Sequence, residues 1–323
     1  MGLKENKLAE IGKLSLTFGV EIECYAPSSQ ADMARTFAQE TLEDAGVVAV
    51  DTGYTHRVTD YWKIVTDASL SYGGIEIVSP ILFGEHGMSE LQKVVDALKN
   101  AGFYVNTTTG THVHFGIERA TLKHVKAFAK SYLRYEHVID WMVGKSRRSN
   151  NGMIKAHTHG RKMRMDDRFN RIGNARSVMD ICSAVSDGDR YYKLNFDSYR
   201  RQRTMEIRHF GGSLNFTKIK NWILLLDAMW RLAYVYSPTV IYKDIEKPAE
   251  NAYSFFKKSL DFEPEIAEYW HDRIKKNLAR ERRQTAASMR REARQARNER
   301  DASVQGQRDL NRQAAWASGR NNR

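Results

Sequence analysis

Seven ionisable residues occur at a spacing that could support metal or phosphate chemistry. They lie in the segments FGVEIE, GGIEIVSP, GTHVHFG and TMEIRHFGG, where charged or imidazole side chains alternate with aliphatic ones. Residues two apart in a β-strand lie on the same face, so each segment would present its polar side chains on one face and its aliphatic ones on the other. The residues are Glu21 and Glu23, Glu76, His112 and His114, and Glu206 and Arg208.

These side chains would form an unusually acidic surface if the four strands share one sheet. Four glutamates would then face two histidines and one arginine, and Asp67 is expected to be a fifth carboxylate. Like charges at close range destabilise a sheet unless a cation lies between them. Oxygen ligands with a minority of imidazole suit Mg²⁺ or Mn²⁺, and protein-bound Mg²⁺ commonly completes its shell with substrate phosphates. We therefore predict a site for divalent cations.

Two other interpretations of the same residues stay open. An amphipathic strand with glutamates on its solvent face is ordinary, although none of these four strands carries a lysine on that face. His112, His114 and Glu118 also fit HxHx₃E, the first half of a cupin metal site. The second half, Gx₅PxGx₂H, does not follow in the sequence.

The elements that must position these residues alternate along the first 260 positions between strand-like and helix-like patterns. Strands are expected at residues 14–25, 61–65, 75–81, 111–117, 191–196 and 204–210. Helices are expected at residues 32–45, 89–101, 121–143 and 217–236. Strands and helices with hairpin-length connections predict one α+β domain over residues 1–270, with a mainly antiparallel sheet.

The net charge of +12 comes from two segments rather than from the whole chain. Residues 272–323 hold 15 Lys and Arg against 6 Asp and Glu, and residues 145–176 hold 10 against 2. The remaining body is mildly acidic, so the high overall charge describes the two segments and not the fold.

Each basic segment has two interpretations. Residues 145–176 lack periodicity and predict a long loop, which either closes over phosphates or is a solvated surface loop. The arginines considered for phosphate contact are Arg147, Arg148, Arg161 and Arg164. Residues 271–323 predict a basic tail, helical at first and disordered from 301, which is either simply solvated or attracted to a polyanion.

Several site types are not expected. His157 and His159 repeat the HxH spacing, but no carboxylate lies near them in the sequence before Asp166. Cys24 and Cys182 have no CxxC spacing, and we expect Cys24 to be a small buried side chain rather than a catalytic thiol. The longest apolar run, residues 223–226, is far shorter than the roughly 20 residues of a membrane span. Without a recognisable targeting segment, we expect a cytoplasmic protein.

Taken in order, the four motifs resemble the amidoligase family. These are phage and bacterial carboxylate-amine ligases related to glutamine synthetase and glutamate-cysteine ligase, and the resemblance covers about residues 17–233. It implies a glutamine-synthetase-like fold, a curved antiparallel sheet with helices on its outer side. It also implies a phage or prophage gene.

The activity implied by the resemblance is ATP-dependent amide formation. A carboxylate attacks the γ-phosphate of ATP, an acyl phosphate forms, and an amine displaces the phosphate. Neither the carboxylate nor the amine is identified. The sequence has no P-loop, so ATP would bind by other means. The resemblance implies Mg²⁺, or Mn²⁺, at Glu21, Glu23, Glu76, His112 and Glu206.

The resemblance also implies roles for four further residues. His114 matches a position that contacts nucleotide phosphate. Arg203 and Arg208 match arginines that bind phosphate or the substrate carboxylate, and Asp67 matches an acidic position near the metals or the incoming amine. Asp67 is therefore a candidate base for the amine.

Two functions of other classes compete with the ligase. A metal-dependent phosphohydrolase or nuclease could use the same acidic cluster, with the basic tail binding nucleic acid. A non-catalytic phage assembly or nucleic-acid-binding protein could retain the fold without the activity.

Overall fold

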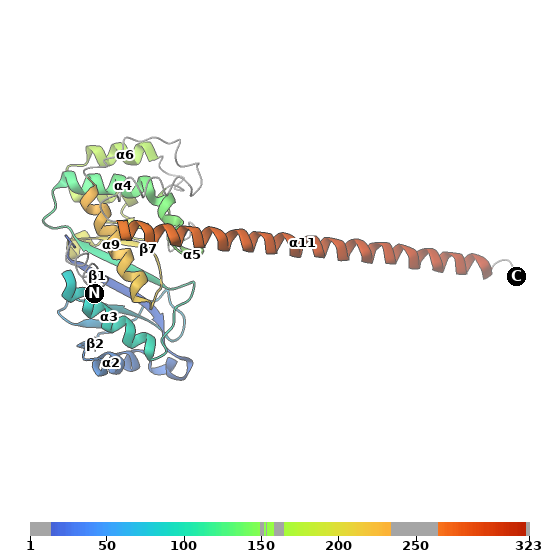
Figure 1. Cartoon of the computed structure of the whole chain (residues 1–323), viewed down its shortest axis with the longest axis horizontal. Helices are drawn as coiled ribbons and strands as arrows, with labels where there is room; N and C mark the ends of the chain where they lie inside the picture. The colour runs from blue at the N-terminus through green and yellow to red at the C-terminus, as the bar shows by residue number, and fades with distance from the viewer. Residues whose placement is uncertain (1–13, 149–151, 153, 158–164, 234–263, 321–323) are drawn as a thin grey trace. The chain divides into compact units, whose positions relative to one another are not determined.

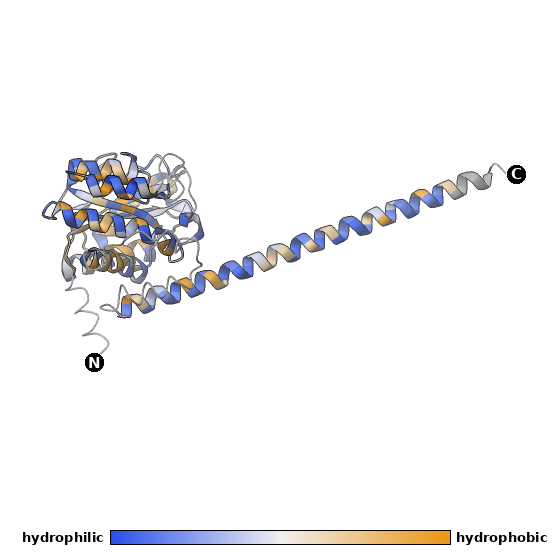
Figure 2. Cartoon of the chain, turned by 90° about the horizontal axis from the view of Figure 1, so that it is seen from above, coloured by the Kyte–Doolittle hydropathy of each residue, from blue (hydrophilic) through white to orange (hydrophobic). Residues whose placement is uncertain are grey.

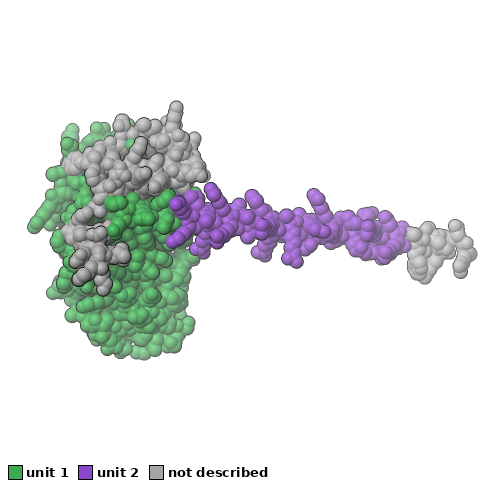
Figure 3. All heavy atoms as spheres, viewed as in Figure 1, with its two compact units in different colours: residues 1–273 green, residues 274–323 purple. Residues whose placement is uncertain are grey.

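The computed structural model describes residues 14–148, 152, 154–157, 165–233 and 264–320. The chain divides into two compact units, residues 1–273 and 274–323, which Figure 3 shows in two colours. The first unit holds a seven-stranded sheet and most of the helices. The second unit belongs to one helix.

The sheet confirms the predicted α+β class and its mainly antiparallel character. Its strand order is β2-β3-β4-β1-β5-β7-β6, and only the pair β2 and β3 is parallel. The strands are β1 (Phe18–Tyr25), β2 (Ala49–Asp51), β3 (Trp62–Val65), β4 (Gly74–Val78), β5 (Gly110–Gly116), β6 (Leu194–Asn195) and β7 (Thr204–Gly211). The strand β1 lies near the centre, between β4 and β5, so the first acidic motif has neighbours on both sides.

Four of the longer helices of the first unit are arranged in a row. In Figure 1, helices α4, α9, α3 and α2 succeed each other from top to bottom. The helices and the 3₁₀ segment that the structure describes in the first unit are η1 (Ser28–Met33), α2 (Ala34–Asp44), α3 (Gly84–Asn100), α4 (Leu122–Asp140), α5 (Lys145–Arg148), α6 (Met165–Asn174), α7 (Val178–Ser186), α8 (Tyr199–Gln202) and α9 (Phe216–Leu232). The helix α11 (Pro264–Arg320) begins in the first unit and continues through the second.

The aliphatic residues between the polar positions form the core, as the alternation predicts. Ile22, Ile77, Val113 and Ile207 are all completely buried. Side chains of β3 and β7 contact helices: the indole of Trp62 donates to Glu90 on α3, and Phe210 stacks on Trp222 of α9. One face of the sheet therefore packs against helices, which leaves the polar positions on the other face.

Some expected elements differ in the structure. The segment 145–176 contains the helices α5 and α6, and α7 and the short β2 were not predicted. The predicted disorder from residue 301 is wrong, because α11 continues to Arg320. Ala, Arg and Gln are good helix formers, so a helix can persist there without an apolar face. His159, Arg161 and Arg164 lie outside the described residues.

No helix among the described residues is both long and apolar enough to cross a membrane.

Candidate metal and anion site

Strand pairing brings the four predicted motifs together on one face of the sheet. In β1, Glu23 lies opposite Glu76 of β4, and Glu21 lies opposite His112 of β5. On the other side of β5, His114 lies opposite Glu206 of β7. Residues that are directly opposite in antiparallel strands have Cβ atoms about 4.5–5.5 Å apart. The motifs are therefore side-chain neighbours although they are up to 185 positions apart in the sequence.

A β-bulge directs Arg208 into the same group. Val113 pairs with Ile207 and Thr111 with Phe210, so two residues of β7, Arg208 and His209, lie opposite the single residue between them on β5. A bulge of this kind redirects a side chain at the point where the strand has an extra residue. Arg208 turns toward the carboxylates, whereas His209 turns the other way and bonds Tyr132 of helix α4.

His112 lies at the centre of the polar face. Its Nδ1 is 3.1 Å from Glu21 Oε2 and its Nε2 is 3.4 Å from Glu23 Oε1, and the residue is only 2% exposed. The guanidinium of Arg208 is 2.7 Å from Glu206 Oε1 and 3.3 Å from His112 Nδ1. One imidazole of β5 thus contacts side chains from two other strands, β1 and β7.

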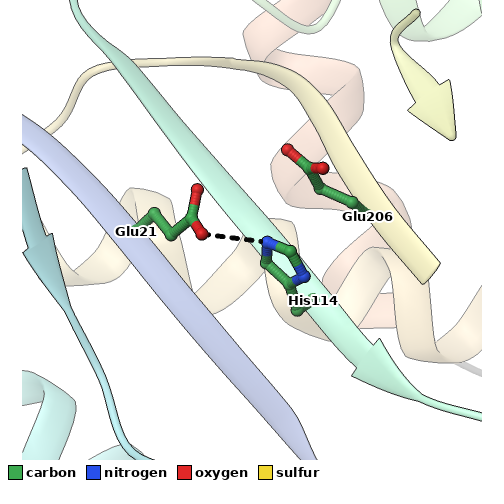
Figure 4. Close-up of side chains that lie close together, drawn as sticks. All are labelled: Glu21, His114 and Glu206. Carbon is green, nitrogen blue, oxygen red and sulfur yellow. Dashed lines mark ion pairs between the residues drawn. The ribbon is translucent and has the colours of Figure 1, made fainter. Parts of the chain in front are cut away.

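Three overlapping groups of side chains offer ligand atoms that all lie within 4.8 Å of one another. The groups are Glu21, His114 and Glu206; Glu21, Glu76 and His112; and Glu23, Asp67 and Glu76. Figure 4 shows the first group, with one residue each from β1, β5 and β7. Because Glu21 and Glu76 each belong to two groups, the site can hold neighbouring cations that share carboxylates. We call the five acids in these groups the carboxylate cluster: Glu21, Glu23, Asp67, Glu76 and Glu206.

The electrostatics of the carboxylate cluster fit a divalent cation. Burial and repulsion by Glu21 and Glu23 raise the pKa of Glu76 well above its usual value. Burial acts on Glu21 in the same direction, but His114 and His112 outweigh it and hold the Glu21 pKa well below its usual value. The same face of the sheet therefore favours the ionised form of Glu21 and disfavours the ionised form of Glu76. A bound cation would relieve this repulsion.

The imidazole of His114 gives a second indication of fit. Its Nδ1 bonds Thr204 Oγ1 at 3.1 Å. Its Nε2 is buried and lies 3.2 Å from Glu21 Oε1, yet it lacks the geometry of a hydrogen bond (Figure 4). The bond to Thr204 fixes the orientation of the ring, so that Nε2 could bind a cation or, when protonated, the oxygen of a phosphate. Carboxylate oxygens with a minority of imidazole suit Mg²⁺ or Mn²⁺.

The other two predicted residues have different surroundings. Asp67 is half-buried and adjoins Glu23 and Glu76, and its Oδ1 accepts from the backbone N–H of Ser69 at 2.7 Å. Arg203 is exposed, has a left-handed backbone (φ 57°), and places its guanidinium over the ring of Tyr199. Unlike the other predicted residues, Arg203 has no described contact with the carboxylate cluster.

Arg147 joins the site although the sequence offered it only as one of several loop arginines. It is 5% exposed, donates from Nη2 to the Thr108 carbonyl at 3.2 Å, and has a buried Nε without a partner. Burial lowers its pKa, an effect that the charge of Glu23 opposes. A Cβ at Gly110 would meet His112 Nε2 at 2.7 Å and Arg147 Nη2 at 3.2 Å. Because glycine has no side chain, position 110 leaves room for His112 and Arg147.

Lys63 is a functional candidate that the sequence analysis missed. It pairs with Val78 on β4, two positions from the pair of Val65 with Glu76, so it shares the polar face. The residue is 3% exposed, and its Nζ donates to the Arg57 carbonyl at 2.7 Å. Burial lowers the Lys63 pKa against the pull of Glu21 and Glu76. A lone lysine between apolar residues in a predicted strand was the available signal.

The second HxH spacing has a structural explanation. The ring of His157 is fully buried, with Nδ1 on the Glu136 carboxylate and Nε2 3.0 Å from the Leu194 carbonyl. The carboxylate partner of His157 is distant in the sequence, because Glu136 comes from helix α4, 21 positions earlier. Both nitrogens are used within the protein, so His157 is not free to bind a metal. Cys24 is likewise fully buried, and burial raises the pKa of its thiol.

Comparison with known proteins agrees with the motifs. A search of curated proteins found no match. A family model described as "Putative amidoligase enzyme" matches residues 14–230, about two thirds of the chain. This range contains all four motifs and every residue of the carboxylate cluster. The chain therefore belongs to the amidoligase family.

Proposed function

We propose that the protein is an ATP-dependent carboxylate-amine ligase that uses Mg²⁺, with Mn²⁺ as an alternative. The observation that carries the proposal is the convergence of the carboxylate cluster, two histidines, the buried Arg147 and the half-buried Arg208 on one face of the sheet. Membership of the amidoligase family supports the same reaction class. The proposal includes a glutamine-synthetase-like fold, a phage or prophage gene, and activity in the cytoplasm.

The metal ligands in this proposal are the five residues with the motif spacing, Glu21, Glu23, Glu76, His112 and Glu206. When bound, Mg²⁺ would neutralise phosphate charge and orient the phosphates of ATP. The chain's own contribution is to hold the carboxylates on rigid strands. Arg208 supports this by bonding Glu206, and together with His114 it outweighs the effect of burial and keeps the Glu206 pKa low.

Anion binding falls to the arginines beside the carboxylate cluster. Planar guanidinium groups bind two oxygens of a phosphate or carboxylate at once, which a lysine cannot do. Arg208 and Arg147 are both largely buried, where such contacts are strong. We assign them to the transferred phosphoryl group and the substrate carboxylate. His114 and the exposed Arg203 are assigned to nucleotide phosphate.

The reaction also requires the amine to lose a proton. A substrate carboxylate takes the γ-phosphoryl group and ADP leaves; the amine then attacks the acyl carbon and inorganic phosphate leaves. Asp67 is half-buried and lies between two exposed residues, 66 and 68, so a second substrate can approach it. We assign Asp67 as the base that accepts the amine proton.

The test is product formation from mixed substrates. The protein is incubated with ATP, Mg²⁺ and a panel of amino acids and polyamines, and dehydrative adducts are sought by mass spectrometry while ADP release is followed. We expect ADP release that requires both a carboxylate and an amine. Glu76→Gln should abolish it, whereas Glu85→Gln, at an exposed position on α3, should not.

The same assay separates the competing functions. Cleavage of DNA without any nucleotide, or phosphate release from ATP that no added amine affects, would contradict the ligase and favour a phosphohydrolase or nuclease. Absence of both Mg²⁺ and ATP binding would favour a non-catalytic protein that retains the fold.

A further inference from the structure

The helix α11 has a long stretch without tertiary packing. It comprises 57 residues, and all side chains from residue 282 to residue 314 are exposed. Figure 2 shows its hydrophobic residues scattered among hydrophilic ones rather than joined in a stripe. A helix that is polar all round needs many internal ion pairs or a partner to be stable.

Cations are concentrated on one face of this helix. Successive residues in an α-helix are about 100° apart, so spacings of three, four and seven keep side chains on one side. Eight cations follow these spacings and fall within an arc of roughly 100°. They are Lys276, Arg280, Arg283, Arg290, Arg294, Arg297, Arg308 and Arg312, and we call them the basic stripe.

Most acids of this segment lie on the other side. Glu281, Glu292 and Glu299 project roughly 160° away from the middle of the basic stripe. Asp301 lies within the arc of the stripe and Asp309 about 20° beyond its edge, and they pair at 3.9 Å with Arg297 and Arg312. The glutamates are therefore separated from the stripe across the helix, and the two aspartates pair only with its C-terminal part.

The middle of the basic stripe has no counter-ion in the part of the chain that the structure describes. Within the described residues, Arg283, Arg290 and Arg294 form no ion pair. Arg290 and Arg294 are also i,i+4 neighbours, and like charges at that spacing destabilise an isolated helix by a few tenths of a kcal/mol. The stripe thus does not stabilise its own helix, and an external anion would.

The chemistry of the other faces selects among anionic partners. An anionic membrane requires an apolar face. Met289, Val304 and Leu310 spread over an arc of roughly 120° on the side away from the stripe, but Arg282 and Arg300 lie in the same arc and interrupt it. Binding of single strands relies on aromatic stacking, and no aromatic residue occurs from 274 to 314. A nucleic-acid duplex presents a dense array of phosphates to arginines and requires neither feature.

We infer that the basic stripe of α11 binds the phosphate backbone of double-stranded nucleic acid without sequence preference. The stripe is about 54 Å long at 1.5 Å per residue. Guanidinium groups suit phosphate oxygens, and an arginine face without base-reading side chains provides affinity rather than sequence recognition. This inference does not depend on the ligase proposal, because it concerns residues outside the carboxylate cluster.

Fluorescence anisotropy of the full chain with a labelled duplex DNA of mixed sequence tests the inference. The affinity should fall steeply with salt, with a slope of log K against log salt of roughly −4 to −7 if most of the stripe contacts phosphates. Arg290→Gln with Arg294→Gln should reduce the slope by about 1.8 and weaken binding roughly 10- to 60-fold at 0.1 M salt. Glutamine is a good helix former, and circular dichroism checks that α11 persists.

The matched control is Arg282→Gln with Arg300→Gln, which removes the same charge from a different face. This control should retain nearly the wild-type affinity and slope. Equal losses in the two double variants, no binding by the wild type, or tighter binding to anionic vesicles than to duplex would each overturn the inference. Glu76→Gln should bind duplex like the wild type, so failure of the ligase proposal would be distinguishable from failure of this one.

Discussion

Two polar clusters lie on opposite faces of the same sheet and differ in how their charges are balanced. We call the one on the helix side the helix-side network: Tyr132, Glu136, Asp140, His157, Lys193 and His209. Its members bond one another: Lys193 Nζ and His209 Nε2 each lie 2.6 Å from Asp140 Oδ1, and Tyr132 bonds His209 at 2.9 Å. Two acids face three nitrogen bases, and each charge has a partner.

The carboxylate cluster on the other face has an excess of acids. Five carboxylates face the histidines, Arg208, and the more distant Arg147 and Lys63. The helix-side network is the more buried of the two, yet burial and repulsion raise the pKa of Glu76, whereas His157 and Lys193 help to hold the pKa of Glu136 down. Burial of polar groups therefore does not identify a functional site. An excess of buried charge of one sign is a better indication, because a bound ligand of opposite charge would stabilise it.

The two clusters meet along β7. Arg208 belongs to the carboxylate face and His209, the next residue, belongs to the helix-side network. The backbone N–H of Arg208 also donates to the Lys193 carbonyl at 2.8 Å. The helix-side network therefore holds the bulge from which the guanidinium of Arg208 is directed. The comparison predicts that changes to the helix-side network reduce stability, and that changes to the carboxylate cluster reduce ligand binding and turnover.

The largest effect is expected for Lys193→Met. It leaves Glu136 and Asp140 buried with one cation fewer, and breaking a buried ion network typically costs about 3–5 kcal/mol in the free energy of unfolding. Urea denaturation measures the loss, with Lys93→Met at an exposed position as the control. A loss similar to that of the control would mean that the network is not structural.

Arg208→Lys should reduce turnover by about 10² to 10³-fold while leaving metal binding nearly intact. Lysine keeps the charge next to Glu206 but cannot bind two oxygens of a transferred group. Steady-state kinetics of ADP release, with Mn²⁺ binding measured by calorimetry, separates the two properties. Parallel loss of metal affinity and turnover would show that Arg208 acts by organising the ligands instead.

The acid limb of stability should depend on Glu136. Burial raises its pKa, but His157, Lys193 and His209 outweigh that effect and lower it to about 2. Because the folded-state pKa lies below the unfolded value, the stabilisation is complete above about pH 4.3 and is lost as the pH falls toward 2. Over this pH range, the titration of Glu136 should remove about 3 kcal/mol from the free energy of unfolding.

Denaturation at several pH values tests that prediction. Glu136→Gln should be less stable than the wild type at pH 7 and should lose less stability between pH 4.5 and 2. The wild type and the variant would have parallel pH profiles if Glu136 did not titrate with this shift.

The smallest expected effect on folding is that of Glu76→Gln. Removing one of several repelling carboxylates should change the free energy of unfolding by about 1 kcal/mol or less and should favour the metal-free protein. Metal affinity should nevertheless fall. Loss of a residue that only supports a metal ligand typically costs about 10- to 100-fold in affinity, and loss of Glu76 should cost at least as much. Thermal unfolding with and without Mn²⁺ reports both. A marked loss of stability without metal would put Glu76 in the same class as Lys193.

Local periodicity allowed much of the fold to be predicted. The strands β1, β5 and β7 were predicted because polar and aliphatic residues alternate there, and a period of two determines which side chains share a face. The same alternation identified Glu21, Glu23, His112, His114 and Glu206. The end of α11 was mispredicted because low hydrophobicity was taken to indicate disorder, although the residues are good helix formers.

The amino-acid sequence alone thus determined the class of fold, the polar face and the family, since each depends on residues close together in the chain. Only the tertiary structure decided that β1 lies between β4 and β5, that a bulge directs Arg208 to the carboxylates, and that Glu136 bonds His157. It also placed Arg147 and Lys63 beside the acids. Strand order and long-range contacts depend on which distant segments pack together, and no spacing within a segment encodes that choice.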